Sequence, residues 1–214
     1  MLNSYAEAEA FNRFCNNRQK EQLNITIIFI GNSLTFHETD KNLGWHNANG
    51  MAASLEDKDY AHLVLKTLKI SKEQAIIENF AEIEQKDIEE SQTFQKLKDL
   101  LSMDASYLIF QLGDNISNDE QLNYFWKNMH LLSSFIRDQK VYFVSTWWEH
   151  EVKDSIIQEI CQKYKGNYIY IGDIFKSEDN MDRKKQGYAH PGVDAHPQDW
   201  GMQEIAKRII QKIM

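Results

Sequence analysis

The sequence is poor in cysteine and proline, and it has no long apolar run. Two of its 214 residues are cysteine and two are proline. Because Cys15 and Cys161 lie far apart and outside any CxxC spacing, the sequence predicts neither a disulfide framework nor a zinc site. No run approaches the roughly 18 consecutive apolar residues that a membrane-spanning helix needs. We therefore expect no membrane span.

Positive charge is also scarce. The chain carries 24 Lys and Arg residues against 32 Asp and Glu residues, a formal net charge of −8. No basic cluster is longer than residues 183–185, so this charge balance disfavours a nucleic-acid partner. The first seven residues lack the basic and apolar regions of a signal peptide. We therefore expect a cytoplasmic protein, or an extracytoplasmic one if a leader has been removed.

Short apolar runs alternate along the chain with amphipathic helical patterns, and no linker or repeat interrupts them. The runs predict strands over Asn24–Ile30, Gln74–Glu78, Ser106–Leu112, Val141–Thr146 and Asn167–Ile171. Most are apolar throughout, which is typical of a parallel sheet covered by helices on both faces. The last helix is expected after Asp199, a plausible N-cap. The pattern predicts one α/β domain over residues 1–214, with residues 1–20 as a helical extension.

Two of the predicted strands end in residues that suit acyl chemistry. Gly31-Asn32-Ser33 follows the first strand. Because ligands gather at the carboxyl ends of parallel strands, Ser33 is well placed to act as a nucleophile. Asn115 follows the third strand, where its amide could donate a hydrogen bond to a developing oxyanion. Both segments could instead be ordinary turns.

Both prolines directly follow a histidine, in the segment before the last helix. These pairs are His190-Pro191 and His196-Pro197. Proline stiffens the backbone and favours an extended conformation at the residue before it, which suits a loop that holds an imidazole still. A serine hydroxyl becomes a good nucleophile only when a base accepts its proton. The loop therefore offers a candidate base.

Together these three segments resemble the blocks of the SGNH (GDSL) hydrolase family, in the same order and across nearly the whole chain. Gly31–Thr35 is similar to the block with the catalytic serine, and Gly113–Asn115 to the block whose asparagine helps to form the oxyanion hole. His196 matches the base of the last block. The resemblance implies a three-layer α/β/α sandwich with a flavodoxin-like, mostly parallel five-stranded sheet.

Two of the family's positions match less regularly. For the second-block glycine, whose backbone N–H joins the oxyanion hole, the best match is Gly50. The N–H of Ser33 would complete the hole with Asn115. The family's acid usually stands three residues before the base, where this chain has Val193. Asp194 could still orient His196, or the site could be a Ser-His dyad aided by a backbone carbonyl.

The resemblance implies a serine esterase that acts on a small acyl ester, with an O-acetylated carbohydrate as one candidate. No metal or organic cofactor is required, and an acyltransferase would use the same residues. Four further residues near the expected site are candidates for substrate binding: Asn32, Trp45, Trp147 and Trp148. At least one of the paired tryptophans is expected in the core, because neighbouring residues of a strand point to opposite sides.

Other readings of the same residues remain open. A flavodoxin-like module could use Gly31–Thr35 as an anion cradle for a phosphorylated ligand without catalysis, and would not need His196. A degenerate family member with little turnover is a further alternative. His37 and His46 belong to no His-Glu-x-x-His spacing, so a catalytic metal is not predicted. The acidic run Glu82–Glu90 and the segment Lys176–Lys185 are interpreted as solvated surface.

Overall fold

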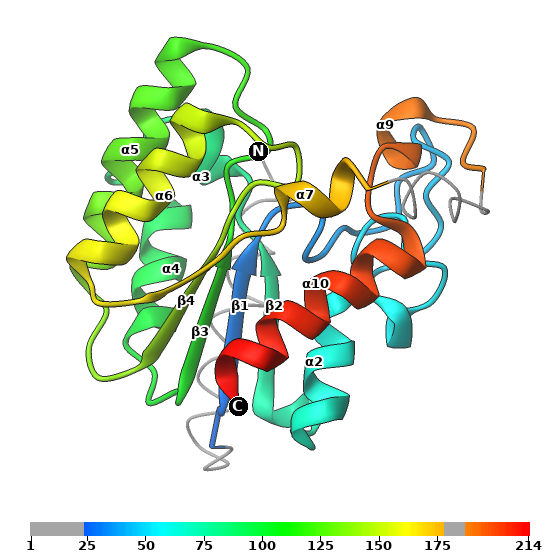
Figure 1. Ribbon diagram of the computed structural model, residues 1–214. Helices are drawn as coiled ribbons and strands as arrows, with labels where there is room; N and C mark the ends of the chain where they lie inside the picture. The colour runs from blue at the N-terminus through cyan, green and yellow to red at the C-terminus, as the bar shows by residue number, and fades with distance from the viewer. Residues whose placement is uncertain (1–23, 178–186) are drawn as a thin grey trace.

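Five parallel strands form the sheet of the computed structural model, which describes residues 24–177 and 187–214. The strands are β1 (Ile27–Gly31), β2 (Ala75–Asn79), β3 (Tyr107–Gln111), β4 (Lys140–Val144) and β5 (Asn167–Ile169). Their order is β2-β1-β3-β4-β5, and every neighbouring pair is parallel. Each strand overlaps one of the predicted apolar runs. The carboxyl ends of β1, β2 and β3 meet at one edge of the sheet (Figure 1).

The strands are apolar throughout because both faces of the sheet are covered. Side chains of successive residues point to opposite faces of a sheet. Ile28 and Ile30 of β1 therefore belong to one hydrophobic cluster, whereas Ile27 and Phe29 belong to another. All four side chains are fully buried.

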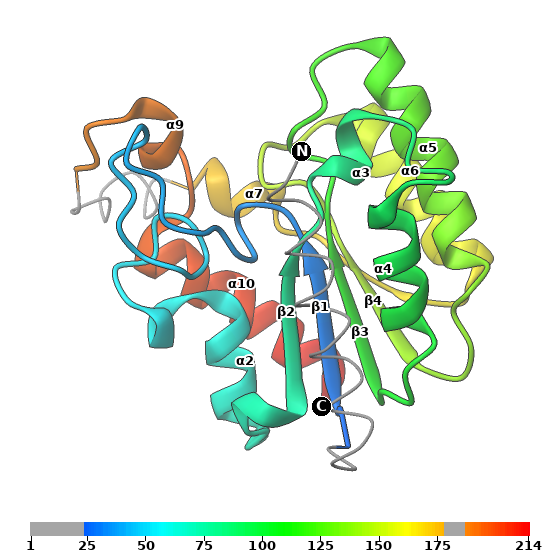
Figure 2. The same cartoon turned by 180° about the vertical axis from the view of Figure 1, so that it is seen from behind.

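Helices form a layer on each face of the sheet (Figures 1 and 2). The first layer consists of α4 (Gln92–Leu101), α5 (Asp119–Ser133) and α6 (Glu151–Lys163), with the single turn α3 (Glu82–Gln85) at its upper end. The second consists of α2 (Tyr60–Leu68), α7 (Gly172–Phe175) and α10 (Gln198–Ile213). The three-layer α/β/α prediction is thereby confirmed, and the sheet is entirely parallel.

The start of the last helix differs from the prediction. α10 begins at Gln198, so Asp199 lies in its first turn and is not the N-cap. The carboxylate of Asp199 instead accepts hydrogen bonds from the backbone N–H and the hydroxyl of Ser54, both at 2.7 Å. These contacts connect α10 to the long loop that follows β1.

That loop covers the carboxyl edge of the sheet together with α9 (Pro191–Asp194). The loop runs from residue 32 to the 3₁₀ turn η1 (Glu56–Lys58), and a second 3₁₀ turn, η2 (Lys72–Gln74), precedes β2. Trp45 and Met51 of the loop pack with Val193 of α9 in a small separate core. The loop therefore forms part of the packed structure above the sheet.

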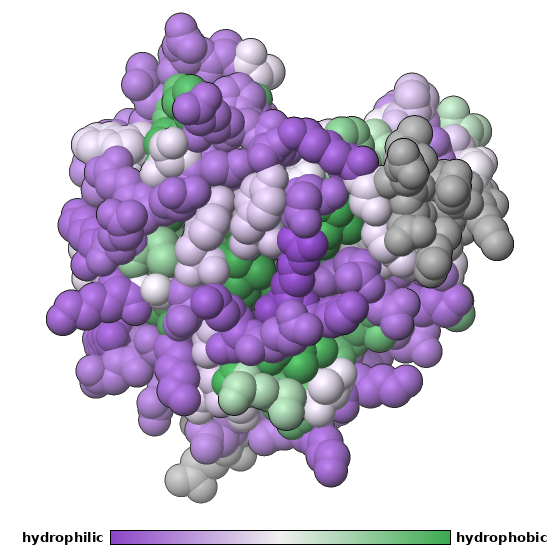
Figure 3. Space-filling model, in the orientation of Figure 1, coloured by the Kyte–Doolittle hydropathy of each residue, from purple (hydrophilic) through white to green (hydrophobic). Residues whose placement is uncertain are grey.

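Hydrophilic side chains cover most of the face seen in Figure 3, and apolar groups show only in small patches between them. Among the described residues, no helix is long and apolar enough to cross a membrane. Cys161 is a buried free thiol of α6. The predicted helical extension over residues 1–20, with Cys15, lies outside the described residues, as does most of Lys176–Lys185.

Candidate active site

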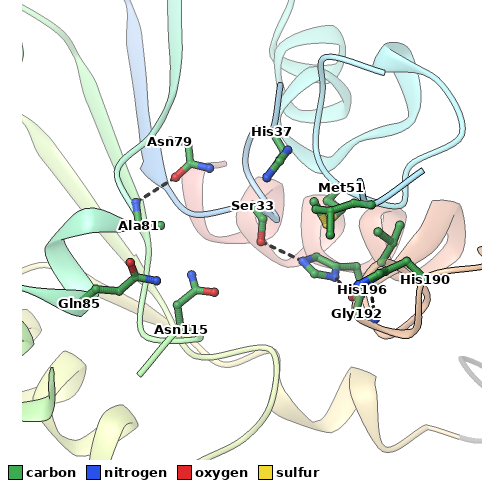
Figure 4. A pocket seen from close by; sticks show the side chains of 12 residues that line it. Ser33, His37, Met51, Asn79, Ala81, Gln85, Asn115, His190, Gly192 and His196 are labelled. Carbon is green, nitrogen blue, oxygen red and sulfur yellow. Dashed lines mark hydrogen bonds between the residues drawn. The ribbon is translucent and has the colours of Figure 1, made fainter. Parts of the chain in front are cut away.

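Ser33 and His196 are in direct contact although 163 positions separate them in the sequence. The Oγ atom of Ser33 lies 2.9 Å from Nε2 of His196 (Figure 4). Ser33 belongs to the turn that follows β1, and His196 to the short connection between α9 and α10. The fold therefore brings a hydroxyl and an imidazole within hydrogen-bonding distance at the carboxyl edge of the sheet.

The other ring nitrogen of His196 faces a main-chain carbonyl. Nδ1 lies 2.6 Å from the carbonyl oxygen of Gly192, in the first turn of α9. A carbonyl can only accept, so this contact places the proton on Nδ1 and leaves Nε2 as the acceptor for the serine O–H. That tautomer is the one that a general base needs.

Asp194 contacts the first residue of α10. Its Oδ1 accepts a hydrogen bond of 3.1 Å from the side-chain amide of Gln198. The sequence left open a triad with Asp194 or a dyad aided by a carbonyl. The contact between Nδ1 of His196 and the Gly192 carbonyl has the geometry of a dyad aided by a backbone carbonyl.

Two tryptophans at the end of β4 support the histidine loop. The indole N–H of Trp147 donates to the carbonyl of Ala195, at 3.1 Å. The ring of Trp148 meets the ring of His196 edge to face, with 5.4 Å between the centroids. Trp147 is fully buried in the core, so its predicted role in substrate binding is wrong, whereas Trp148 is partly exposed.

Trp45 and Asn32 also do not face the site. Trp45 is 1% exposed and donates its indole N–H to the carbonyl of His37, so it is a core residue of the loop. Asn32 is fully buried, and its Oδ1 accepts the backbone N–H of Leu34 at 3.0 Å. Both were predicted to bind substrate, and the structure instead shows them holding the backbone in place.

Gly31 is required by the close packing of the turn that carries Ser33. A Cβ atom at this position would lie 1.8 Å from Oγ1 of Thr35, which no side chain could tolerate. The carbonyl of Asn32 accepts the N–H groups of Thr35 and Phe36, at 3.0 and 3.1 Å. The backbone N–H of Ser33, by contrast, has no partner among the described residues.

The prediction that Gly50 supplies an oxyanion donor is wrong. Its backbone N–H donates to Oδ2 of the buried Asp59, at 3.1 Å. Gly50 packs behind the turn of Ser33, where a Cβ atom would lie 2.6 Å from the carbonyl oxygen of Leu34. The next residue, Met51, donates its N–H to the carbonyl of Ser33, at 2.8 Å. Gly50 thus supports the nucleophile turn from behind.

Asn115 reaches the site from the turn that follows β3. It lies across the pocket from His190 and Gly192, with its amide toward Ser33 (Figure 4). Its Nδ2 donates to Oε2 of Glu84 at 2.5 Å, and its backbone N–H donates to the same oxygen at 3.2 Å. An amide nitrogen carries two hydrogens, so Nδ2 retains one for a second acceptor.

One buried and one half-buried carboxylate lie behind the turns of Ser33 and Asn115. Glu84 of α3 is fully buried, and Asp114 lies beside it with Asn32 between them, donating to both at 3.1 and 3.2 Å. Burial, with a smaller contribution from the charge of Asp114, raises the pKa of Glu84 to about 7. Burial likewise raises the pKa of Asp114 above its usual range. The sequence had placed Glu84 on the solvated surface, which is wrong.

The short helix that carries Glu84 is fixed by an amide of α5. The side chain of Asn128 is buried, and its Nδ2 donates to the carbonyls of Ile83 and Lys86 at 2.9 and 2.8 Å. Its Oδ1 accepts the backbone N–H of Ile88, at 3.3 Å. Asn128 thus satisfies three backbone groups of the segment around α3.

The Ser33–His196 pair opens into a pocket with a volume of about 310 Å³. The wall on the side of α3 is mainly polar and contains Asn79, Gln85 and Asn115, with Ala81 between them. The opposite side contains Met51, with Leu43 and Val193 packed in the same small core, and His37, His190 and Gly192 also line the pocket. The sequence did not predict the residues that follow β2, although strand order alone would place the end of β2 beside the end of β1.

Two histidines that line this pocket, His37 and His190, contact backbone groups nearby. Within residues 24–177 and 187–214, no three His, Cys, Asp or Glu residues are grouped so that they could hold a metal ion. Nδ1 of His37 lies 2.7 Å from the carbonyl oxygen of Glu38, and Nδ1 of His190 accepts the N–H of Gly192 at 3.1 Å. Both rings are therefore oriented by local backbone groups.

The protein is similar to known proteins in structure, whereas comparison of its sequence finds no match. No family model matches the chain, and no curated protein matches it. A protein from Bacteroides ovatus described as a GDSL-like lipase has a TM-score of 0.54 at 11% identity, over 89% of this chain and 98% of its own. Phospholipase A1 from Streptomyces albidoflavus has a TM-score of 0.52 at 11% identity, over 88% and 99% of the two chains.

A family two carbohydrate esterase from Clostridium thermocellum, in complex with cellohexaose, is also similar. Its TM-score is 0.56 at 15% identity, over 88% of this chain and 63% of the esterase. At such low identities the likeness concerns the fold. The chain therefore has the SGNH fold, which it shares with GDSL-like lipases, phospholipase A1 and family two carbohydrate esterases.

Proposed function

We propose that the protein is a serine hydrolase that cleaves small acyl esters, with Ser33 as the nucleophile and His196 as the general base. The observation that carries this proposal is the distance of 2.9 Å between Ser33 Oγ and His196 Nε2. The contact of Nδ1 with the Gly192 carbonyl supports it, because it fixes the basic tautomer. The SGNH fold also supports the proposal, because solved structures of esterases and lipases share it.

The proposed reaction has two halves. Ser33 Oγ attacks the ester carbonyl and passes its proton to Nε2 of His196, forming a tetrahedral intermediate. The alcohol leaves with that proton, and the acyl group remains on Ser33. A water molecule then attacks the acyl carbonyl and gives a proton to His196, which returns it to Ser33 as the carboxylic acid departs.

The negative charge of the tetrahedral intermediate requires hydrogen-bond donors. Two candidates are available beside Ser33: the second N–H of the Asn115 amide and the backbone N–H of Ser33 itself. Donors that are already in place act without reorganisation, and loss of one donor typically costs a factor of about 10² to 10³ in kcat. Asn115 and Ser33 are therefore the oxyanion donors of the proposal.

An O-acetylated carbohydrate is the substrate class to test first. The pocket of about 310 Å³ suits a small acyl group, and its polar wall offers amides that can hydrogen-bond hydroxyl groups. The likeness to an esterase solved with cellohexaose points the same way. The same residues could pass the acyl group to a sugar hydroxyl in place of water, which product analysis would reveal.

The alternative of a phosphate-binding module is disfavoured by the surroundings of the Gly31–Thr35 turn. Two of its N–H groups, those of Leu34 and Thr35, already donate to Asn32, as does the N–H of the next residue, Phe36. The carboxylates of Glu84 and Asp114 both contact the Asn32 side chain. A permanent phosphate charge would be repelled by these groups.

Labelling with a fluorophosphonate, which reacts with activated serines, tests the proposal. We expect the probe on the peptide that contains Ser33 in the wild type, and no label in Ser33→Ala or His196→Ala. Ser134→Ala and His130→Ala are matched controls on the surface of α5, and their labelling should equal that of the wild type. A folded wild type that stays unlabelled would contradict the proposal. If Ser33 is labelled, a panel of esters graded by acyl length would identify the substrate.

A further inference from the structure

The carboxylate of Glu84 collects four N–H donors from the two turns that form the active site. Oε1 accepts the Asn32 amide at 3.1 Å and the backbone N–H of Gly113. Oε2 accepts the backbone N–H and the side-chain amide of Asn115, at 3.2 and 2.5 Å. Asn32 directly precedes Ser33, so one buried side chain joins the nucleophile turn to the turn of Asn115.

This arrangement fits the ionised carboxylate. An ionised carboxylate only accepts hydrogen bonds, and here N–H groups occupy both of its oxygens. A protonated Glu84 would place an O–H group against at least one of these donors. The same chemistry sets the orientation of Asn115, because a carboxylate attracts the NH₂ end of an amide and repels its oxygen.

We propose that Glu84 is a positioning residue of the active site, whose ionised carboxylate holds the Asn115 amide so that its second N–H is directed at the oxyanion. Glu84 is fully buried and does not line the pocket, so it acts through Asn115 and does not touch the substrate. This inference rests on the proposed esterase activity, because an oxyanion forms only if Ser33 attacks an ester.

The environment of Glu84 makes this ionisation sensitive to pH near neutrality. Burial and the neighbouring charge of Asp114 raise the pKa of Glu84 to about 7. Three side chains from the β1 turn and the Asn115 turn face Glu84. Asn32 and Asn115 are neutral amides, and Asp114 is the one ionisable group among them. Asn128 of α5, which binds the backbone of α3, is also neutral.

Steady-state hydrolysis of p-nitrophenyl acetate by variants of the full chain provides the first test. In Glu84→Gln an NH₂ group replaces one acceptor and meets N–H donors, so we expect kcat to fall about 10- to 100-fold with KM changed less than about threefold. Glu84→Asp retains the charge and should recover part of kcat. Glu82→Gln is the matched control in the same helix, because Glu82 pairs with Lys86 at the surface. Its kcat should stay at the wild-type value.

A double-mutant cycle with Asn115→Ala separates positioning from general damage to the fold. If Glu84 acts through Asn115, Glu84→Gln should lower kcat much less in the Asn115→Ala background than in the wild type. Equal losses in both backgrounds, or an unchanged kcat in Glu84→Gln, would overturn the inference. An inactive wild type would instead count against the proposed function.

A second measurement does not depend on activity. The side-chain amide protons of Asn115, assigned by their loss in Asn115→Asp, should shift in NMR spectra as the pH of the wild type is raised from 5.5 to 8.5. The shift should persist in Asp114→Asn, moved to lower pH, and disappear in Glu84→Gln. Asn115 amide protons that do not respond to pH would refute the contact even if the protein hydrolyses no ester.

Discussion

At the scale of single residues, a main-chain carbonyl, that of Gly192, faces Nδ1 of His196. The Gly192 carbonyl can fix the tautomer and the ring plane as a carboxylate would. It carries a dipole and no net charge, so in the proposed reaction it would stabilise the imidazolium of the transition state less strongly than a carboxylate does. A Ser-His dyad of this kind has to rely more on the donors around the oxyanion.

This arrangement predicts a small effect of Asp194→Asn. The Asn oxygen can still accept the hydrogen bond from Gln198, and Nδ1 of His196 keeps its contact with Gly192. We expect kcat/KM to stay within a factor of about 10 of the wild type, whereas disabling a true triad acid costs about 10⁴. Ester hydrolysis at a pH where the wild type is fully active measures this. A loss of several thousandfold would assign Asp194 as the acid.

The sequence could single out Ser33, Asn115 and His196 as candidates because each lies in a short block with its own chemistry, and all three line one pocket. Glu84 could not be recognised in the same way. Its burial depends on contacts with Asn32 and Asn115, which lie 52 and 31 positions away. Within the acidic run Glu82–Glu90, the only local signal is the presence of Ile83 and Ile88, both of which are buried.

At the scale of elements, the turn of Ser33 is supported from behind by the loop segment around Gly50. The N–H of Gly50 donates to Asp59, whose other carboxylate oxygen caps α2 through the N–H of His62 at 2.8 Å. Met51 donates to the Ser33 carbonyl. The position of the nucleophile is thus connected to the first turn of α2.

We therefore expect Gly50→Ala to disturb both stability and the nucleophile. Its Cβ would lie 2.6 Å from the Leu34 carbonyl oxygen and 2.9 Å from Cβ of Asp59, so backbone must shift. Overpacking of this kind costs about 1 to 3 kcal/mol of unfolding free energy. Urea denaturation gives the stability, and the rate of fluorophosphonate labelling reports on Ser33. Wild-type values in both measurements would show that the loop yields without moving the turn.

The strands could be predicted because burial on both faces leaves an apolar run in the sequence. The pocket wall at the end of β2 could not be predicted, because no motif in the sequence marks Asn79, Ala81 or Gln85. For the family's second-block glycine, the best match in the sequence is Gly50 of the long loop. A single glycine does not reveal whether its N–H faces a ligand or, as here, a buried carboxylate.

At the scale of the whole molecule, the buried Glu84 connects stability to pH. Its pKa is raised from the usual 4.5 to about 7 in the folded protein. Between these values the folded state binds a proton that the unfolded chain does not bind, so stability from this group is present at low pH and is lost as the pH rises through about 7. The proposed activity needs the opposite protonation state.

The difference in unfolding free energy between the wild type and Glu84→Gln should accordingly depend on pH. We expect the wild type to gain roughly 1 to 3 kcal/mol relative to the variant as the pH falls from 8 to 5. Taking the difference removes the contributions of Asp114 and the histidines to a first approximation. Urea titrations at several pH values measure it. A difference that is constant over this range would mean that Glu84 titrates normally.

The amide of Asn128 extends the active site into the helical layer. Because its side chain holds three backbone groups around α3, detachment of that single helical turn would break all three contacts with α5. Amide hydrogen exchange at Gly113 and Asn115, whose N–H groups donate to Glu84, should then proceed only in openings that also release α3. The turn of Asn115 and α5, a helix that contributes no residue to the pocket, would thus belong to one cooperative unit.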